Sequence, residues 1–105
     1  MSDKILSFLG ICKRAKKLVI GAEITEESVR EGRSELVLYA EDASENSLKR
    51  VRRAARERGV EMLCLDRDKE GLSCALGRLC AVLSVEDKGF ADKLREMLKR
   101  GELDD

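Results

Sequence analysis

Five consecutive apolar residues, Leu36 to Ala40, place the strongest limit on the folds open to this chain. A strand with one face in water alternates apolar and polar side chains, whereas a strand covered on both faces has an unbroken apolar run. The segments before and after this run carry helical patterns. We therefore expect a strand over 35–40 in the middle layer of a three-layer α/β/α sandwich.

Helix and strand patterns alternate along the rest of the chain. Ile5, Phe8, Leu9 and Cys12 recur at helical spacing after Asp3, which can cap that helix. The further expected strands are 18–20, 61–65 and 80–85. The further expected helices are 22–31, one that starts at Asp42 or Ser44 and stops at Gly59, 68–77 and 87–101. The pattern predicts one domain over residues 1–105, an α/β fold with a four-stranded mixed, mostly parallel sheet.

Charge is balanced in total but not along the chain. Lys and Arg number 21, as do Asp and Glu, so the net charge is zero. Four cations and no anion lie between Gly10 and Leu18, and Ser47 to Arg58 holds six cations against Glu57 alone. Salt screens distant acids beyond about 8 Å, so such patches can still meet phosphates locally. On the third helix Lys49, Arg53 and Arg56 form a stripe that is typical of a solvated face and only secondarily indicates nucleic acid.

The residues that usually hold metals or disulfides do not form recognisable sets. Cys12, Cys64, Cys74 and Cys80 lack paired or finger-type spacing, and the chain has no histidine. We expect reduced, mostly buried cysteines, and no cofactor or metal. The apolar run from Ile5 to Cys12 is too short to cross a membrane. We expect a cytoplasmic monomer without a membrane partner.

Gly21 marks the junction that gathers most polar groups. It separates the short strand Leu18 to Ile20 from a helix, and the unpaired N–H groups of a first helical turn suit phosphate or a base edge. Four cations lie just upstream and form what we call the basic elbow: Lys13, Arg14, Lys16 and Lys17. Ile24 projects among the acidic side chains of this helix, either as a staple against a neighbouring element or as a ligand contact.

Catalysis would have to rest on carboxylates, since no nucleophile or cofactor motif is present. Glu41 and Asp42 follow a strand at the edge where open α/β sheets bind ligands. A small carboxylate enzyme is therefore one alternative, although Asp42 is better explained as a helix cap and Glu41 as its solvated neighbour.

Several separated motifs resemble one family. They are the run KILSFLGICKRAKKLVIGAE, the run LVLYAEDASENS, the segment GLSCALGR, and Asp87 to Ala91. Over residues 4 to about 98 the chain is similar to the small bacterial YlxQ-like proteins of the kink-turn-binding ribosomal protein superfamily. That superfamily includes the archaeal "seven-Ae" and eukaryotic "thirty-e" large-subunit proteins. The resemblance implies an α/β/α sandwich without catalytic activity that grips sharply bent RNA through two loops.

The two loops of the family fall on identifiable residues here. The strand-to-helix turn, commonly GxNExxK, reads tandem G·A pairs and falls on Gly21, Glu23, Ile24 and Glu27. The loop before the last strand covers a splayed-out base and falls on Arg78, Leu79, Cys80 and Ala81. Glu23 stands in place of an asparagine, Ile24 in place of a glutamate and Glu27 in place of a lysine, so strict kink-turn selectivity does not follow.

We therefore predict a non-enzymatic protein that binds structured RNA, kink-turn-like or ribosomal, through the glycine turn, the basic elbow and the apolar loop. The predicted RNA-binding residues are Lys13, Arg14, Lys16, Lys17, Gly21, Ala22, Glu23, Ile24, Glu27, Arg78, Leu79 and Cys80. The alternative is a protein-interaction module on the same scaffold. Its contact surface would be the acidic second helix, with Glu23, Glu26, Glu27 and Glu31.

Overall fold

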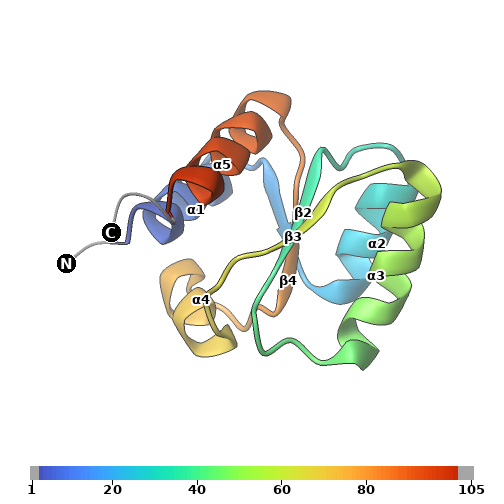
Figure 1. Cartoon of the computed structure of the whole chain (residues 1–105), viewed down its shortest axis with the longest axis horizontal. Coiled ribbons are helices and arrows are strands. Elements are labelled where there is room, and N and C mark those ends of the chain that lie inside the picture. The colour runs from blue at the N-terminus through green and yellow to red at the C-terminus, as the bar shows by residue number, and fades with distance from the viewer. Residues whose placement is uncertain (1–2, 102–105) are drawn as a thin grey trace.

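The computed structural model describes residues 3–101, which form a sheet between two layers of helices (Figure 1). The helices are α1 Lys4–Arg14, α2 Ala22–Arg30, α3 Glu45–Arg58, α4 Lys69–Leu76 and α5 Lys88–Gly101. The strands are β1 Leu18–Ile20, β2 Leu36–Tyr39, β3 Met62–Cys64 and β4 Val82–Val85. The predicted three-layer α/β/α class is confirmed. The ends of the predicted domain, 1–2 and 102–105, lie outside the described residues.

The sheet has the strand order β1-β4-β2-β3. β2 and β3 are parallel, whereas β4 is antiparallel to both of its neighbours, β1 and β2. Three strands therefore share one direction and the sheet is mixed, as predicted. The expected predominance of parallel pairing is wrong, because the reversed strand lies inside the sheet and not at its edge.

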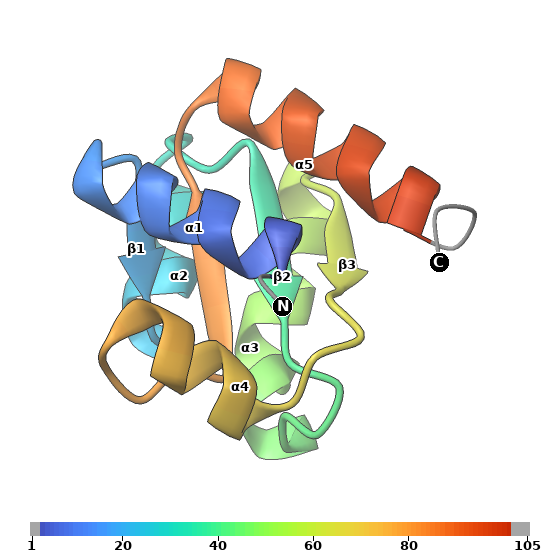
Figure 2. The ribbon, with the colours of Figure 1, turned by 90° about the vertical axis from the view of Figure 1, so that its left-hand side faces the viewer.

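The short helix α4 explains the reversed strand. Val82, the first residue of β4, lies opposite Tyr39, the last residue of β2. The chain therefore re-enters the sheet at the edge where β2 and β3 end. Figure 2 shows α4 lying across that end of the sheet. A helix of eight residues spans about 12 Å and here does not carry the chain back to the opposite edge.

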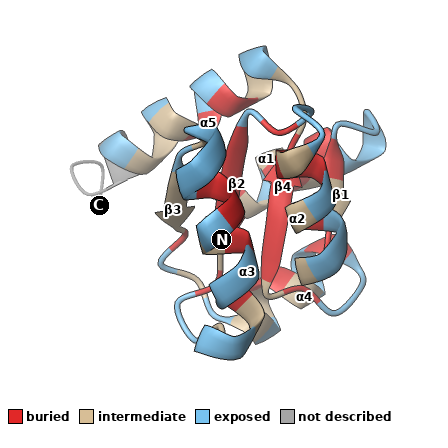
Figure 3. Ribbon diagram, turned by 90° about the vertical axis from the view of Figure 1, so that its right-hand side faces the viewer, coloured by how far each residue is buried: buried red, intermediate tan, exposed pale blue. Residues whose placement is uncertain are grey.

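Both faces of the sheet are covered, as the unbroken apolar run indicated. Leu36, Leu38 and Leu83 face α1, α4 and α5 in one core cluster. Val37 and Val82 face α2 and α3 in the other. Figure 3 shows the two central strands buried, with exposed residues on the outer sides of the helices.

Several helix starts carry the caps that the sequence predicts. Asp3 accepts hydrogen bonds from the amides of Ile5 and Leu6, and Asp68 accepts one from Gly71. Ser44, not Asp42, caps α3, by accepting from the amide of Ser47. No helix within residues 3–101 is both long and apolar enough to span a membrane.

The cysteines are all free thiols, and burial separates them into classes. Cys12 and Cys80 are buried and Cys64 is partly buried, whereas Cys74 is exposed. The prediction of mostly buried cysteines therefore holds apart from Cys74, which is exposed beside a depression between α1 and α4. Burial raises the pKa of both the Cys12 and the Cys80 thiol to about 11.

Candidate functional site

Gly21 joins β1 to α2 in a conformation that side chains rarely adopt. Its φ is 122° and its ψ is 153°, and as the residue before the helix it has no side chain to cap the first turn. Its amide donates to the carbonyl of Val82 at 2.9 Å, and its carbonyl accepts from the amide of Thr25 at 3.0 Å. The bend is therefore fixed at both ends, while the amides at the start of α2 have no intrahelical acceptors.

An open groove lies beside this bend. It has a volume of about 590 Å³. Its lining combines β1, the first turn of α2, α1 and the loop after α4: Lys13, Leu18, Val19, Ile20, Gly21, Ala22, Glu23, Ile24 and Arg78. The structure thus brings the glycine turn, one basic residue of the elbow and one residue of the second loop into a single depression.

Lys13 connects α1 to the end of α4. Its Nζ donates a hydrogen bond to the carbonyl of Leu76 at 2.5 Å. Leu76 is the last residue of α4, where cations are favoured by the helix dipole. The next residue, Gly77, adopts the left-handed conformation with φ 73° and starts the loop toward β4. Lys13 therefore helps to hold the loop that carries Arg78 against the groove.

The loop between α4 and β4 is tied down at its ends and exposed in its middle. The amide of Cys80 donates to the Ser73 hydroxyl at 2.9 Å, and the carbonyl of Ala81 accepts from Ala40 at 2.8 Å. Leu79 is 83% exposed between these anchors, whereas Cys80 is 1% exposed and belongs to the core. Leu79 can therefore touch a ligand, and the expectation that the Cys80 side chain does so is wrong.

Ile24 presents an apolar side chain to solvent on the groove wall. It is 42% exposed, and its Cγ2 lies 3.7 Å from where a Cβ on Gly21 would sit. A staple against a neighbouring element would have buried this side chain. Of the two interpretations of Ile24, the geometry favours a surface contact.

The four cations of the basic elbow do not form one cluster. Lys13 lines the groove, whereas Arg14 lies in a second depression between α1 and α4. Lys17 lies at the far end of β1, where its carbonyl accepts from the amide of Glu86 at 2.8 Å. At roughly 3.3 Å per residue, four steps of extended chain separate Lys17 from Gly21 by about 13 Å. Lys16 and Lys17 are exposed at that other edge of the sheet.

The acidic side of α2 is largely neutralised by arginines. Glu26 pairs with Arg30 at 3.0 Å and with Arg50 of α3 at 3.2 Å. Arg33 pairs with Glu31 and lies 3.8 Å from Glu27. Within residues 3–101, Glu23 forms no ion pair and faces the groove. The surface that a protein partner would read is thus less acidic than the sequence suggests.

Asp42 has a structural role that the sequence did not indicate. Its carboxylate accepts a hydrogen bond from the amide of Lys69 at 2.8 Å, which ties the end of β2 to the start of α4. The adjacent Glu41 donates its amide to the carbonyl of Arg67 at 2.8 Å. These contacts fix the loop between β2 and α3, and they account for Asp42 without an acid/base role. Within the part of the chain that the structure describes, no group of metal-binding side chains gathers.

Sequence reasoning missed the contribution of β1 itself. Among residues 3–101, β1 pairs with β4 alone and lies at the edge of the sheet, and its three residues line the groove. Nothing in the short apolar segment Leu18 to Ile20 indicates that it lies at an edge. That position depends on where β4 enters the sheet.

Comparisons with known proteins support one family. The model of the "Ribosomal protein L7Ae/L30e/S12e/Gadd45 family" matches residues 3–95. The RNA-binding protein YlxQ of Enterococcus faecium is 31% identical over 98 residues, covering 92% of this chain and 93% of that protein. The RNA-binding protein YlxQ of Bacillus subtilis (strain 168) is 34% identical over 91 residues, covering 86% and 90%.

Solved structures have the same fold. A protein with unknown function from Bacillus halodurans superposes with a TM-score of 0.85 at 27% identity, covering 93% of this chain and 99% of that one. A 15.5 kD RNA-binding protein of Giardia lamblia superposes with a TM-score of 0.70 at 19% identity, covering 98% and 92%. At 19% identity, the similarity to the Giardia lamblia protein shows only that the two share a fold.

Proposed function

Because the chain belongs to the ribosomal protein L7Ae/L30e/S12e/Gadd45 family, we propose that it is a non-catalytic protein that binds structured RNA in the groove beside Gly21. The observation that carries the proposal is the meeting of two loops that are distant in sequence. The turn from Gly21 to Ile24 and the loop of Arg78 line one depression. The relatives named as RNA-binding proteins support the same partner.

The glycine turn would read the edge of a base. Gly21 has no side chain to keep a base at a distance, and the first amides of α2 are free to donate. The carboxylate of Glu23 can accept the imino and amino protons of a guanine. Sequence-specific recognition of RNA targets bulges and unstacked bases, which offer such edges.

The second loop would supply apolar cover and positive charge. Leu79 and Ile24 are both exposed, and Arg78 lines the groove near Ile24. An unstacked base can lie against Leu79 or Ile24 while the Arg78 guanidinium meets a phosphate. Cys80 supports this loop from the core and takes no direct part.

The basic elbow would act at two places because its cations are separated. Lys13 would shape the groove through Leu76 and can donate its remaining N–H groups to a phosphate. Arg14, Lys16 and Lys17 would meet only an RNA that extends beyond the groove. Glu27, beside Arg33, places a carboxylate where the family pattern has lysine, so we expect modest selectivity for tandem G·A pairs.

We propose ribosomal RNA or a kink-turn-like RNA as the partner, bound by a monomer of one domain in the cytoplasm. The test is titration of the protein with a kink-turn RNA, an unbent duplex of equal length and total ribosomal RNA at two salt concentrations. We expect the bent RNA and the ribosomal RNA to bind more tightly than the duplex. Equal, weak binding of all three would overturn the proposal.

A matched pair of variants tests the site itself. Leu79→Ser removes the apolar loop residue, whereas Ile11→Ser removes an exposed apolar residue of α1 that does not line the groove. Leu79→Ser should weaken binding of the bent RNA several-fold, and Ile11→Ser should leave it unchanged. Equal effects of the two variants would contradict the proposed site.

A further inference from the structure

We propose that the outer face of α3 is a second RNA contact that holds the phosphate backbone of the duplex flanking the groove. This inference rests on the proposed function, since it extends the same RNA beyond Gly21. It concerns a different surface, on which three cations of α3 neither pack against another helix nor form ion pairs with the described residues. The partner would be recognised by charge and spacing and not by sequence.

Two cations of α3 have ion-pair partners within the described residues, and a third lies at the helix end. Arg50 pairs with Glu26 at 3.2 Å. Arg52 pairs with Glu45 at 3.4 Å, and its guanidinium lies 5.8 Å from the centre of the Tyr39 ring. Arg58 lies in the last turn, where a cation is favoured by the helix dipole.

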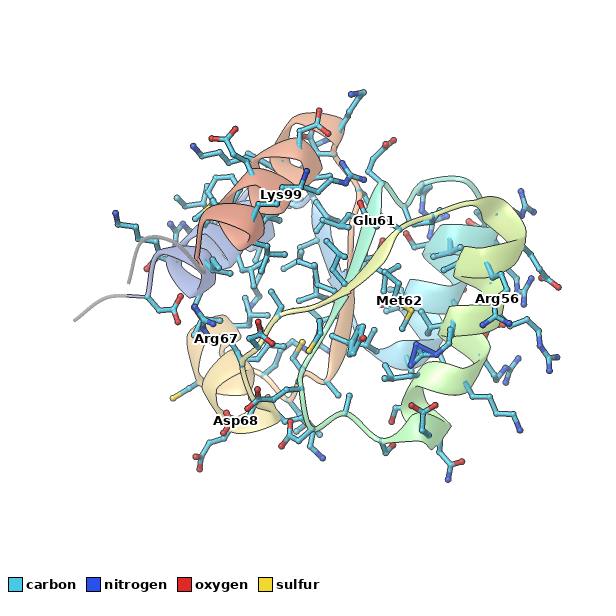
Figure 4. The ribbon with its side chains drawn as sticks, in the orientation of Figure 1. Arg56, Glu61, Met62, Arg67, Asp68 and Lys99 are labelled. Carbon is cyan, nitrogen blue, oxygen red and sulfur yellow. The ribbon has the colours of Figure 1, made fainter. Side chains whose placement is uncertain are left out.

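Lys49, Arg53 and Arg56 form the phosphate stripe of our proposal. All three are exposed, and none forms an ion pair with a residue in the range 3–101. Their spacing places them on one side of the helix, opposite the buried Leu48 and Val51. Figure 4 shows Arg56 on α3, in the layer farthest from α5.

Nearby acids do not neutralise this stripe. Glu57 is adjacent to Arg56, but its carboxylate accepts a hydrogen bond from Arg30 at 2.8 Å. Glu45 lies four residues before Lys49, and its carboxylate is 3.4 Å from the guanidinium of Arg52. That hydrogen bond, more than the fields of Arg53 and Arg58, lowers the pKa of Glu57. The dipole favours Arg56 in the last turn, yet Lys49 and Arg53 lie outside that turn. Their positive charge is therefore available to an external anion.

The helix that carries the stripe starts at the same end of the sheet as the groove. β1 and β2 point in one direction, so the helices that follow them, α2 and α3, start at the same edge of the sheet. The pair Arg50–Glu26 joins the α3 turn that carries Lys49 to α2 one turn beyond Glu23. At about 1.5 Å per residue the stripe then extends about 10 Å from Lys49 to Arg56. An RNA seated at Gly21 can thus lay its flanking phosphates along α3.

The test compares two double variants with the same net charge. Arg53→Gln with Arg56→Gln removes two cations of the stripe. Lys93→Gln with Lys99→Gln removes two exposed cations of α5, which are unpaired within residues 3–101 and lie in the opposite helix layer (Figure 4). Each variant is titrated with a bent RNA that has a long flanking duplex and with one trimmed to the bend. Circular dichroism checks that both variants are folded.

With the long RNA, the α3 variant should bind several-fold more weakly. Its plot of log K against log salt should be shallower by about 1.4 to 1.8, from two lost phosphate contacts. With the trimmed RNA it should bind as the unaltered protein does, and the α5 variant should match that protein on both RNAs. Equal losses of affinity in the two variants, or an α3 variant that keeps full affinity for the long RNA, would overturn this inference. Neither result would contradict the proposed binding of RNA in the groove. Failure of the unaltered protein to prefer bent RNA would instead overturn the proposed function, and this inference with it.

Discussion

Replacing Lys13 with methionine would remove the charged end that joins α1 to α4 and keep most of the aliphatic stem. In the native protein the Nζ atom lies 2.5 Å from the carbonyl oxygen of Leu76. A hydrogen bond from a charged donor contributes about 1.5 to 3 kcal/mol, and a cation at a helix C-terminus about 0.3 to 1 kcal/mol. Water can reach this exposed side chain, so we expect a loss near the lower end, about 1 to 2 kcal/mol.

Urea unfolding followed by circular dichroism measures this loss as a lower midpoint at an unchanged slope. In a domain of this size each 1 kcal/mol lowers Tm by roughly 4 to 8 °C. Lys17→Met is the matched control, because Lys17 is exposed and its side chain makes no ion pair or hydrogen bond within residues 3–101. We expect the control to change stability by less than about 0.5 kcal/mol.

If Lys13→Met and Lys17→Met unfold at the same urea concentration, the contact with Leu76 does not stabilise the loop and the reasoning fails. RNA titration of the same variants then separates two roles of Lys13. A lysine that also meets a phosphate adds about 0.7 to 0.9 to the salt slope, whereas one that only positions the loop leaves the slope unchanged.

Three further predictions concern single positions. Gly21→Ala should destabilise the protein by about 1 to 3 kcal/mol, because alanine is strained at φ 122°. Gly10→Ala, inside α1, should be neutral or stabilising by up to about 1 kcal/mol. Equal changes in Tm for the two variants in thermal unfolding would contradict this. Alkylation of the folded protein should label Cys74 and spare Cys12 and Cys80, because the two buried thiols become reactive only as the pH approaches their pKa of about 11. Equal labelling of the three cysteines near neutral pH, measured by mass spectrometry, would refute this prediction. The hydrogen bond from Arg67 holds the pKa of Asp3 below its ordinary 3.8, so ionised Asp3 should stabilise the fold above pH 3.8 and lose this effect as the pH falls through its folded pKa. Asp3→Asn keeps a capping side chain and should cost about 1 kcal/mol or less near neutral pH, with the difference vanishing in acid; a pH-independent difference in the free energy of unfolding would exclude this role.

Local patterns predicted the elements well because their causes are local. The helix starts at Asp3 and Asp68 are capped by contacts with adjacent residues, and the helix before Gly59 ends because Gly59 adopts the left-handed conformation. The unbroken run from Leu36 correctly predicted a strand buried on both faces. The family follows from several such motifs in the right order.

Long-range placement was harder to predict. The direction of β4 depends on where α4 packs, and no pattern within residues 82–85 encodes it. The carboxylate of Asp42 accepts a hydrogen bond from the amide of Lys69, which is distant in sequence. The residues next to Asp42 suggested instead that it caps the following helix. The elbow cations are neighbours in sequence, but the turn at Lys16, with φ 62°, sends them to different edges.

The sequence indicated that the glycine turn and the loop of Arg78 act together, and both line one groove. That these residues bind RNA remains a prediction. The exposure of Leu79 and the burial of Cys80 depend on which residue faces the core after Gly77, and a loop carries no periodic pattern that fixes this. The contact between Lys13 and Leu76 joins two helix ends and has no sequence signature.

The pairing of β1 with β4 alone has a consequence for how the protein is made. Leu18 to Ile20 are translated before β2 and β3, whereas β4, their partner strand among residues 3–101, is translated after both. Until then β1 has no hydrogen-bonded neighbour, and the groove lacks the wall that contains Arg78. A nascent chain therefore cannot assemble this groove before β4 has been translated, and the site matures only then.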